Sequence, residues 1–127
     1  MKKQIHSEHA PPPGGYYSQG IHAGPFIFVS GQLPFAAGGQ IEAETAAGQT
    51  RQALANVEMI LAEAQASMDN LVSVTIYVSD IDLWPKVNEA YEVYLDDVSI
   101  PPARAVVPTQ ELHFGALVEI SAIAYRE

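Results

Sequence analysis

The sequence predicts an α+β fold, a two-layer sandwich in which two helices cover one face of a mixed sheet. Three observations support this class. Segments typical of strands and helices occur in the order strand, strand, strand, helix, strand, helix, strand, strand. Only two segments have helical periodicity, which leaves the second face of the sheet without a helix. The length of 127 residues predicts a single domain over 1–127.

Three short strands are expected near the N-terminus. Residues 3–6 are a strand candidate, and the proline- and glycine-rich residues 10–15 form a loop. Residues 26–30 are β-branched or aromatic apart from Ser30 and are bounded by glycine and proline, which predicts a strand. Residues 20–23 are its expected hairpin partner.

The first helix is predicted over residues 45–66. Thr45 is a suitable N-cap, because its hydroxyl can accept a hydrogen bond from a free backbone N–H of the first turn. One apolar stripe follows at spacings of three and four residues: Leu54, Val57, Ile60, Leu61 and Ala64.

The second half of the chain predicts a strand, a helix and two further strands. Residues 72–78 alternate, with Val72, Val74, Ile76 and Val78 on one face. Asp82 is the expected cap of a helix that has Pro85 in its first turn and ends before Pro101. Its buried face is Val87, Ala90, Tyr91 and Tyr94. The last strands are 103–107 and 117–125, and the uncovered face predicts self-association.

Composition limits the classes of function. The chain has no cysteine, so disulfides and thiolate chemistry are excluded. The net charge of −9, with only six Lys and Arg, disfavours nucleic-acid binding. No run of about 18 apolar residues is present, and no apolar run follows Lys2 and Lys3 as in a signal peptide. These features predict a cytoplasmic protein that does not insert into membranes.

Arg104 and Glu119 are the candidate catalytic residues, because each is a charged residue within an apolar strand. Arg104 has two possible explanations: an internal ion pair with a carboxylate, or a planar fork that awaits a ligand carboxylate. Glu119 is either a solvent-facing residue of ordinary alternation or a general acid/base tuned by partial burial.

Other polar residues give weaker signals. Tyr17 follows a Gly-Gly turn, and Gly31 after Ser30 permits a ligand to approach the backbone. Ser30 lacks the Gly-x-Ser-x-Gly pattern of a hydrolase nucleophile. The four histidines have no spacing typical of a zinc site, and no phosphate-binding glycine loop is present. No metal site is therefore predicted.

Together these residues resemble the RidA/YjgF family of reactive-intermediate deaminases over nearly the whole chain. The most specific part comprises Pro102-Ala103-Arg104, Val107, Leu112, Val118-Glu119-Ile120 and Ala122-Ile123-Ala124. The supporting matches are Gly15, Tyr17-Ser18-Gln19, Val29-Ser30-Gly31-Gln32, Thr50-Arg51-Gln52-Ala53-Leu54, Asn56, Val87-Asn88-Glu89 and Tyr91.

The resemblance implies a chorismate-mutase-like subunit in a homotrimer, whose sheets form a central barrel with clefts between subunits. It implies hydrolysis of enamines and imines such as 2-aminoacrylate and 2-iminopropanoate to 2-oxo acids and ammonia, without a cofactor. Arg104 would bind the substrate carboxylate, Glu119 would activate water, and Tyr17 would pack on the substrate. Ser30, Gly31, Asn88 and Val106 are the other implied substrate contacts.

Three departures from the family pattern bear on substrate scope. Val106 stands where many members have cysteine, and His113 and Tyr16 replace common prolines. Two other functions stay open: a pathway-specific, aminomuconate-type deaminase, and a non-catalytic trimer that senses 2-oxo acids. Ribonuclease activity, ascribed to some members, is disfavoured by the negative charge.

Overall fold

One six-stranded sheet organises the molecule. Its strands are β1 (Lys2–Ile5), β2 (Gly20–Ala23), β3 (Phe26–Gln32), β4 (Leu71–Val78), β5 (Ala103–Pro108) and β6 (Val118–Tyr125). Their order across the sheet is β1-β2-β3-β6-β4-β5, and only the β4–β5 pair is parallel. The sheet is therefore mixed, as predicted. The computed structural model describes all residues, 1–127.

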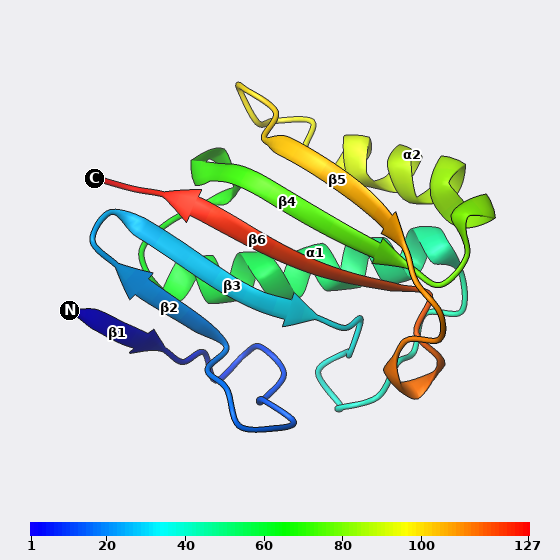
Figure 1. Ribbon diagram of the computed structural model, residues 1–127, viewed down its shortest axis with the longest axis horizontal. Helices are drawn as coiled ribbons and strands as arrows, with labels where there is room; N and C mark the ends of the chain where they lie inside the picture. The colour runs from blue at the N-terminus through cyan, green and yellow to red at the C-terminus, as the bar shows by residue number, and fades with distance from the viewer.

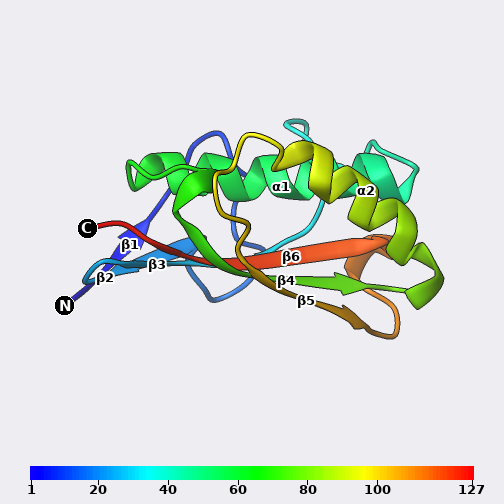
Figure 2. The same cartoon turned by 90° about the horizontal axis from the view of Figure 1, so that it is seen from above.

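Two helices cover one face of this sheet. They are α1 (Ala46–Glu63) and α2 (Trp84–Tyr94), and Figures 1 and 2 show both on the same side, with the opposite face bare. The order of elements and the two-layer arrangement are as predicted. Three 3₁₀ turns, at 68–70, 81–83 and 113–115, complete the connections. Neither α1 nor α2 combines the length and the hydrophobicity that a membrane-spanning helix needs.

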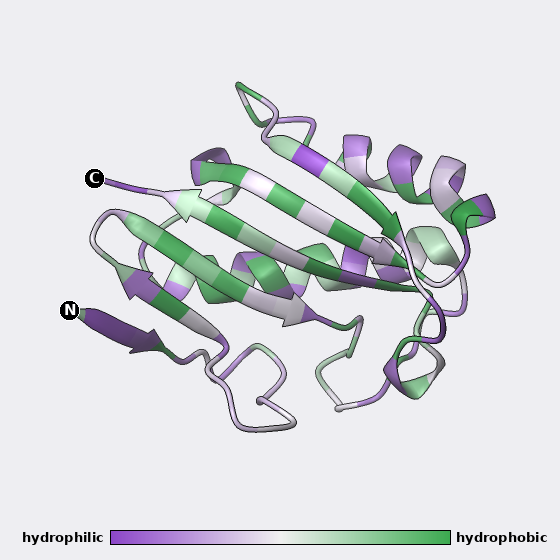
Figure 3. Cartoon of the chain, in the orientation of Figure 1, coloured by the Kyte–Doolittle hydropathy of each residue, from purple (hydrophilic) through white to green (hydrophobic).

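The core lies between the helices and the central strands. Leu54, Val57, Ile60 and Leu61 of α1 are fully buried, and α1 packs on β3 and β6. Figure 3 shows hydrophobic residues along β3, β4 and β6, whereas the edge strand β1 is hydrophilic. Thr45 caps α1 as predicted, since its hydroxyl accepts a hydrogen bond from Gly48 N at 3.0 Å.

The alternation in β4 is broken at its start, so the prediction that Val72 shares the face of Val74, Ile76 and Val78 is wrong. A register shift between Leu71 and Ser73 interrupts the pairing with β6. Leu71 is 4% exposed and takes the core position, whereas Val72 is 43% exposed. An irregularity of one residue moves a side chain to the other face, because side chains alternate along a strand.

Two predicted helix boundaries are also wrong. Asp82 does not cap α2, because the Asp80 carboxylate accepts from Asp82 N at 2.9 Å and caps the 3₁₀ turn that precedes it. Pro85 does lie in the first turn of α2. The first helix ends at Glu63 and not at the predicted residue 66. Gln65 has a φ of 60°, and the N–H groups of residues 64–66 donate to carbonyls in the last turn of α1.

Candidate functional site

Arg104 lies on the edge strand β5 and faces the helices. Its pairing partner on β4 is Val74, which is buried under them. The guanidinium donates to Asn88 Oδ1 at 2.8 Å and lies 4.8 Å from the centre of the Tyr91 ring. No carboxylate lies within 4.0 Å of it. The internal ion pair is therefore excluded, and most of the N–H groups of Arg104 have no protein partner.

Helix α2 supplies the residues that contact Arg104. Asn88 and Tyr91 are three residues apart, which places them on one face of the helix. The Asn88 amide also donates to Glu92 Oε1 at 3.1 Å, and this fixes which end of the amide faces Arg104. Val106 lies two residues after Arg104, on the same side of β5, and packs against the core. The structure therefore brings Asn88, Arg104 and Val106 together.

Glu119 lies on the opposite, bare face of the sheet. Its neighbours Val118 and Ile120 are fully buried toward the helices, so alternation directs Glu119 away from them. Its carboxylate is partly buried and packs against Gly31 of β3. A Cβ at Gly31 would lie 3.2 Å from Glu119 Cδ and closer still to Oε2. A larger residue at position 31 would therefore displace the end of the Glu119 side chain from this position.

Ser30 and Tyr17 lie near Gly31 and already have local partners. Ser30 Oγ donates to the carbonyl of Ser18 at 2.6 Å, so its proton is used and its lone pairs remain free. The Tyr17 hydroxyl accepts from Gly14 N at 3.2 Å, and the residue is 50% exposed. Tyr16 points fully into solvent.

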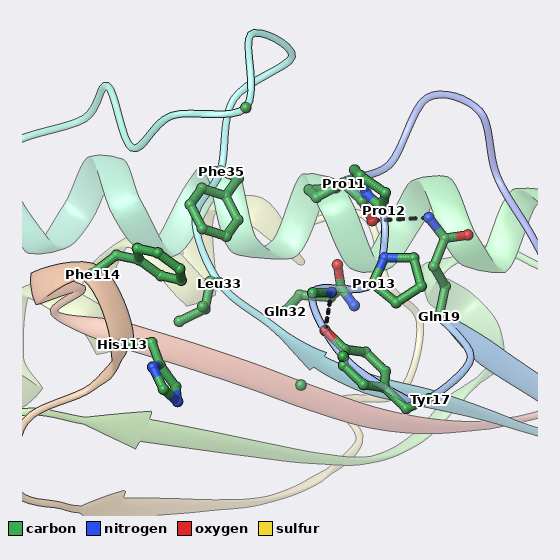
Figure 4. A pocket seen from close by; sticks show the side chains of 14 residues that line it. Pro11, Pro12, Pro13, Tyr17, Gln19, Gln32, Leu33, Phe35, His113 and Phe114 are labelled. Carbon is green, nitrogen blue, oxygen red and sulfur yellow. Dashed lines mark hydrogen bonds between the residues drawn. The ribbon is translucent and has the colours of Figure 1, made fainter.

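A cavity of about 540 Å³ lies at the end of the sheet where β3 ends, between three loops (Figure 4). Gly31 and Tyr17 line it, and Arg104 does not. The remaining lining residues are Pro11, Pro12, Pro13, Gly14, Gly15, Gln19, Gln32, Leu33, Phe35, Gly39, His113 and Phe114. Most of the lining residues are prolines, glycines or aromatic residues, and they lie in loops.

Three buried amide side chains hold the loops around the cavity. Gln19 bonds the carbonyls of Ser7 and Pro11 and accepts from Ser7 N. Asn56 of α1 donates to the carbonyls of Leu33 and Phe35, each at 3.0 Å. Gln49 of α1 donates to the carbonyl of Ala43 and accepts from Leu117 N. We refer to these three residues as the amide anchors.

The aromatic wall of the cavity is a feature that sequence reasoning missed. Phe35 and Phe114 pack edge to face at a centroid distance of 5.2 Å. Phe114 has a φ of 61°, which turns the backbone so that its ring and His113 both line the cavity. The sequence places Phe35 and Phe114 on two unrelated loops, and no local pattern pairs them. His113 is exposed on this wall.

The predicted site residues fall into two groups that do not meet within one chain. Arg104, Asn88 and Val106 lie on the helix side at the β5 edge, whereas Glu119 lies on the bare face beside Gly31. Glu119 pairs with Tyr77, three positions along β4 from Val74, which pairs with Arg104. No group of three or more His, Asp or Glu side chains is arranged to hold a metal ion.

Comparison with known proteins gives consistent relatives over the whole chain. The model of the family described as "Endoribonuclease L-PSP" matches residues 7–126. A RutC family protein from Pyrococcus horikoshii is 41% identical over 128 residues, which is 100% of both chains. A protein of Escherichia coli K12 named 2-iminobutanoate/2-iminopropanoate deaminase is 37% identical, with 99% of each chain covered.

Solved structures agree with these relatives. The YjgF gene product from E. coli has a TM-score of 0.93 at 35% identity, and E. coli TdcF with bound serine has 0.93 at 32%. Each comparison covers 98% of this chain and 99% of the other. The family thus includes proteins named as imine deaminases. The present chain belongs to the endoribonuclease L-PSP family, which is the YjgF/RidA family.

Proposed function

We propose that this protein hydrolyses reactive enamines and imines, such as 2-aminoacrylate, 2-iminopropanoate and 2-iminobutanoate, to 2-oxo acids and ammonia. The observation that carries the proposal is the guanidinium of Arg104, which has no carboxylate partner in the protein. An arginine oriented by an asparagine and otherwise unpaired is suited to bidentate binding of a small carboxylate. The deaminase relatives at 35% and 37% identity support the same reaction.

The proposed chemistry needs orientation, a held water and proton transfer. Arg104 binds the substrate carboxylate, and the Glu119 carboxylate accepts a proton from water as its oxygen adds to the imine carbon. The same carboxyl group then returns the proton to nitrogen. This gives a carbinolamine, whose hydroxyl proton moves to the amine nitrogen as the C–N bond breaks, so that ammonia leaves and the new C=O bond gives the 2-oxo acid. An enamine substrate first takes up a proton at its β-carbon and so becomes the imine. Because an imine carbon is already electrophilic, the reaction as proposed requires no metal or organic cofactor.

This chemistry requires Arg104 and Glu119 to meet across two copies of the chain, and we propose a homotrimer whose bare sheet faces enclose a central barrel. In one chain the two residues lie on opposite faces of the sheet. The bare face also exposes large apolar side chains, namely Phe26, Phe28, Val107 and Tyr125. Burial of such a patch favours self-association. Tyr17, Ser30 and Gly31 would line the same cleft from the Glu119 side.

A coupled assay tests the activity. Threonine dehydratase generates 2-iminobutanoate in solution, and the appearance of 2-oxobutanoate is timed with and without this protein. We expect a clear acceleration that is proportional to protein concentration. Binding of 2-oxobutanoate without acceleration would instead indicate a sensing trimer. Acceleration only with enamines derived from aromatic compounds would indicate a pathway-specific deaminase.

Mixed oligomers test the shared site. We expect Arg104→Ala and Glu119→Ala each to be inactive, whereas co-refolding them in equal amounts restores about a quarter of the activity in a random trimer. Each restored site takes Arg104 from one variant and Glu119 from the other. Refolding each variant alone is the control. No recovery in the mixture, in oligomers shown by light scattering to contain both variants, would contradict a site built by two copies.

Two further expectations complete the proposal. RNA is a disfavoured substrate despite the family description, because a net charge of −9 repels a phosphate backbone. A cytoplasmic location stays a prediction from composition.

A further inference from the structure

Arg104 is held by few contacts for so long a side chain. It makes one hydrogen bond, to Asn88 Oδ1, although a guanidinium has several N–H donors. A single hydrogen bond fixes one edge of the group and leaves rotation about that bond free. Holding a flexible side chain in one orientation costs conformational entropy, which further contacts must offset. A second contact is therefore needed to fix the plane of the guanidinium.

The ring of Tyr91 supplies a contact of the required kind. Arg104 Cζ lies 4.8 Å from the ring centroid, within the range in which a cation is attracted to an aromatic face. Tyr91 is 6% exposed, so the ring itself is fixed by the packing of α2 against the sheet. The rigid ring of Tyr91 restrains the tilt of the Arg104 guanidinium, whereas Asn88 holds one edge of that group.

The hydroxyl group of Tyr91 does not explain the presence of this residue. It is buried and has no hydrogen-bond partner, an arrangement that costs free energy relative to phenylalanine. Burial raises the pKa of Tyr91, although the charge of Arg104 opposes this shift. The phenol is therefore neutral near pH 7, and its attraction to Arg104 comes from the face of the ring.

We infer that Tyr91 is a positioning residue for Arg104, whose guanidinium plane it fixes so that the unpaired N–H groups meet a substrate carboxylate in bidentate geometry. The inference rests on the proposed function in that Arg104 is taken to bind a carboxylate. It adds a residue from the core of the molecule to those that decide which ligands bind.

The test compares two variants and two ligands. Tyr91→Phe keeps the ring, and Tyr91→Met fills the space without one. Binding of 2-oxobutanoate and of its neutral amide, 2-oxobutanamide, is measured by calorimetry, which needs no turnover. We expect the wild-type preference for the acid to persist in Tyr91→Phe and to fall about fivefold in Tyr91→Met, as loss of a cation–π contact predicts. In turnover, KM should rise more than kcat falls.

The ratio of the two affinities separates positioning from general damage. A purely structural defect weakens both ligands alike and leaves the ratio unchanged, so an unchanged ratio in Tyr91→Met would overturn the inference. An equal loss in Tyr91→Phe would also overturn it, because the ring would then be irrelevant. If Tyr91→Met does not fold, NMR of the wild type decides. The Arg104 side-chain protons must show an upfield ring-current shift, and its absence would refute the stacking.

The outcomes also distinguish this inference from the proposed function. A protein that does not accelerate imine hydrolysis but loses its preference for the acid in Tyr91→Met would retain the positioning role and lose the deaminase assignment. A protein that is an active deaminase and keeps the same preference for the acid in both variants would retain the deaminase assignment and lose the positioning role of Tyr91.

Discussion

Replacement of Arg104 by lysine is expected to lower kcat/KM for 2-iminobutanoate at least a hundredfold. Lysine keeps the charge but presents a point cation, so it cannot reproduce the two parallel hydrogen bonds of a guanidinium to a carboxylate. It also loses the stacking on Tyr91 and the fixed bond to Asn88. Charge-assisted hydrogen bonds contribute about 1.5–3 kcal/mol each, and two of them account for a loss of this size.

The protein should remain folded in this variant, because Arg104 has no ion pair whose loss would leave a buried charge. Thermal unfolding followed by circular dichroism checks this point. Arg51→Lys is the matched control, since Arg51 is exposed on α1 and has no ion pair. We expect the control to keep wild-type turnover. Near-normal turnover in Arg104→Lys would exclude the carboxylate-anchor role.

A single methyl group at Gly31 should also lower turnover. Gly31→Ala places a carbon against the carboxylate of Glu119, so Glu119 must move from its position. The backbone of Gly31 is not in the left-handed region, so alanine at this position introduces no conformational strain of its own. General acid–base groups contribute about 10²–10⁴-fold, and we expect kcat to fall at least tenfold. The cost in the free energy of unfolding should be small, because the crowded atoms are the end of a flexible, partly exposed side chain that can swing aside.

Two further variants show whether the effect acts through Glu119. Gly38→Ala is the control, because its nearest neighbour would be Glu42 Oε2 at 3.7 Å, an ordinary contact. It should leave both kcat and stability unchanged. Adding Glu119→Ala to Gly31→Ala removes the crowded side chain, so the double variant should have the kcat of Glu119→Ala alone if the two changes act through one group. If Gly31→Ala had full kcat, the position of the Glu119 carboxylate would not matter for turnover.

Much of the fold could be predicted because it follows from local patterns. Alternation identified β4, helical spacing identified the buried stripe of α1, and Thr45 marked the start of that helix. The errors at Val72 and Asp82 have one cause. Alternation and capping rules assume an uninterrupted element, whereas β4 begins with a register shift and α2 follows a 3₁₀ turn.

The site could be predicted only in part. Arg104 and Glu119 were identifiable as charged residues in apolar strands. Whether Arg104 forms an internal ion pair or is left for a ligand carboxylate depended on residues of α2 that are distant in the sequence. The contact between Gly31 and Glu119 joins two strands far apart in the sequence and has no local signal. Tyr91 was predicted to be a core residue, and it is one. Its contact with Arg104 depends on how α2 lies over β5, which periodicity does not determine.

The amide anchors have a consequence for how this protein can change over time. The side chains of Gln19, Asn56 and Gln49 bond backbone carbonyls and N–H groups of the loops, not the side chains of the loop residues. Residues such as Tyr16 and His113 can therefore be exchanged while the loops keep their course. Selection is free to alter which molecules enter the cavity by single substitutions, without rebuilding the scaffold that places the charged residues.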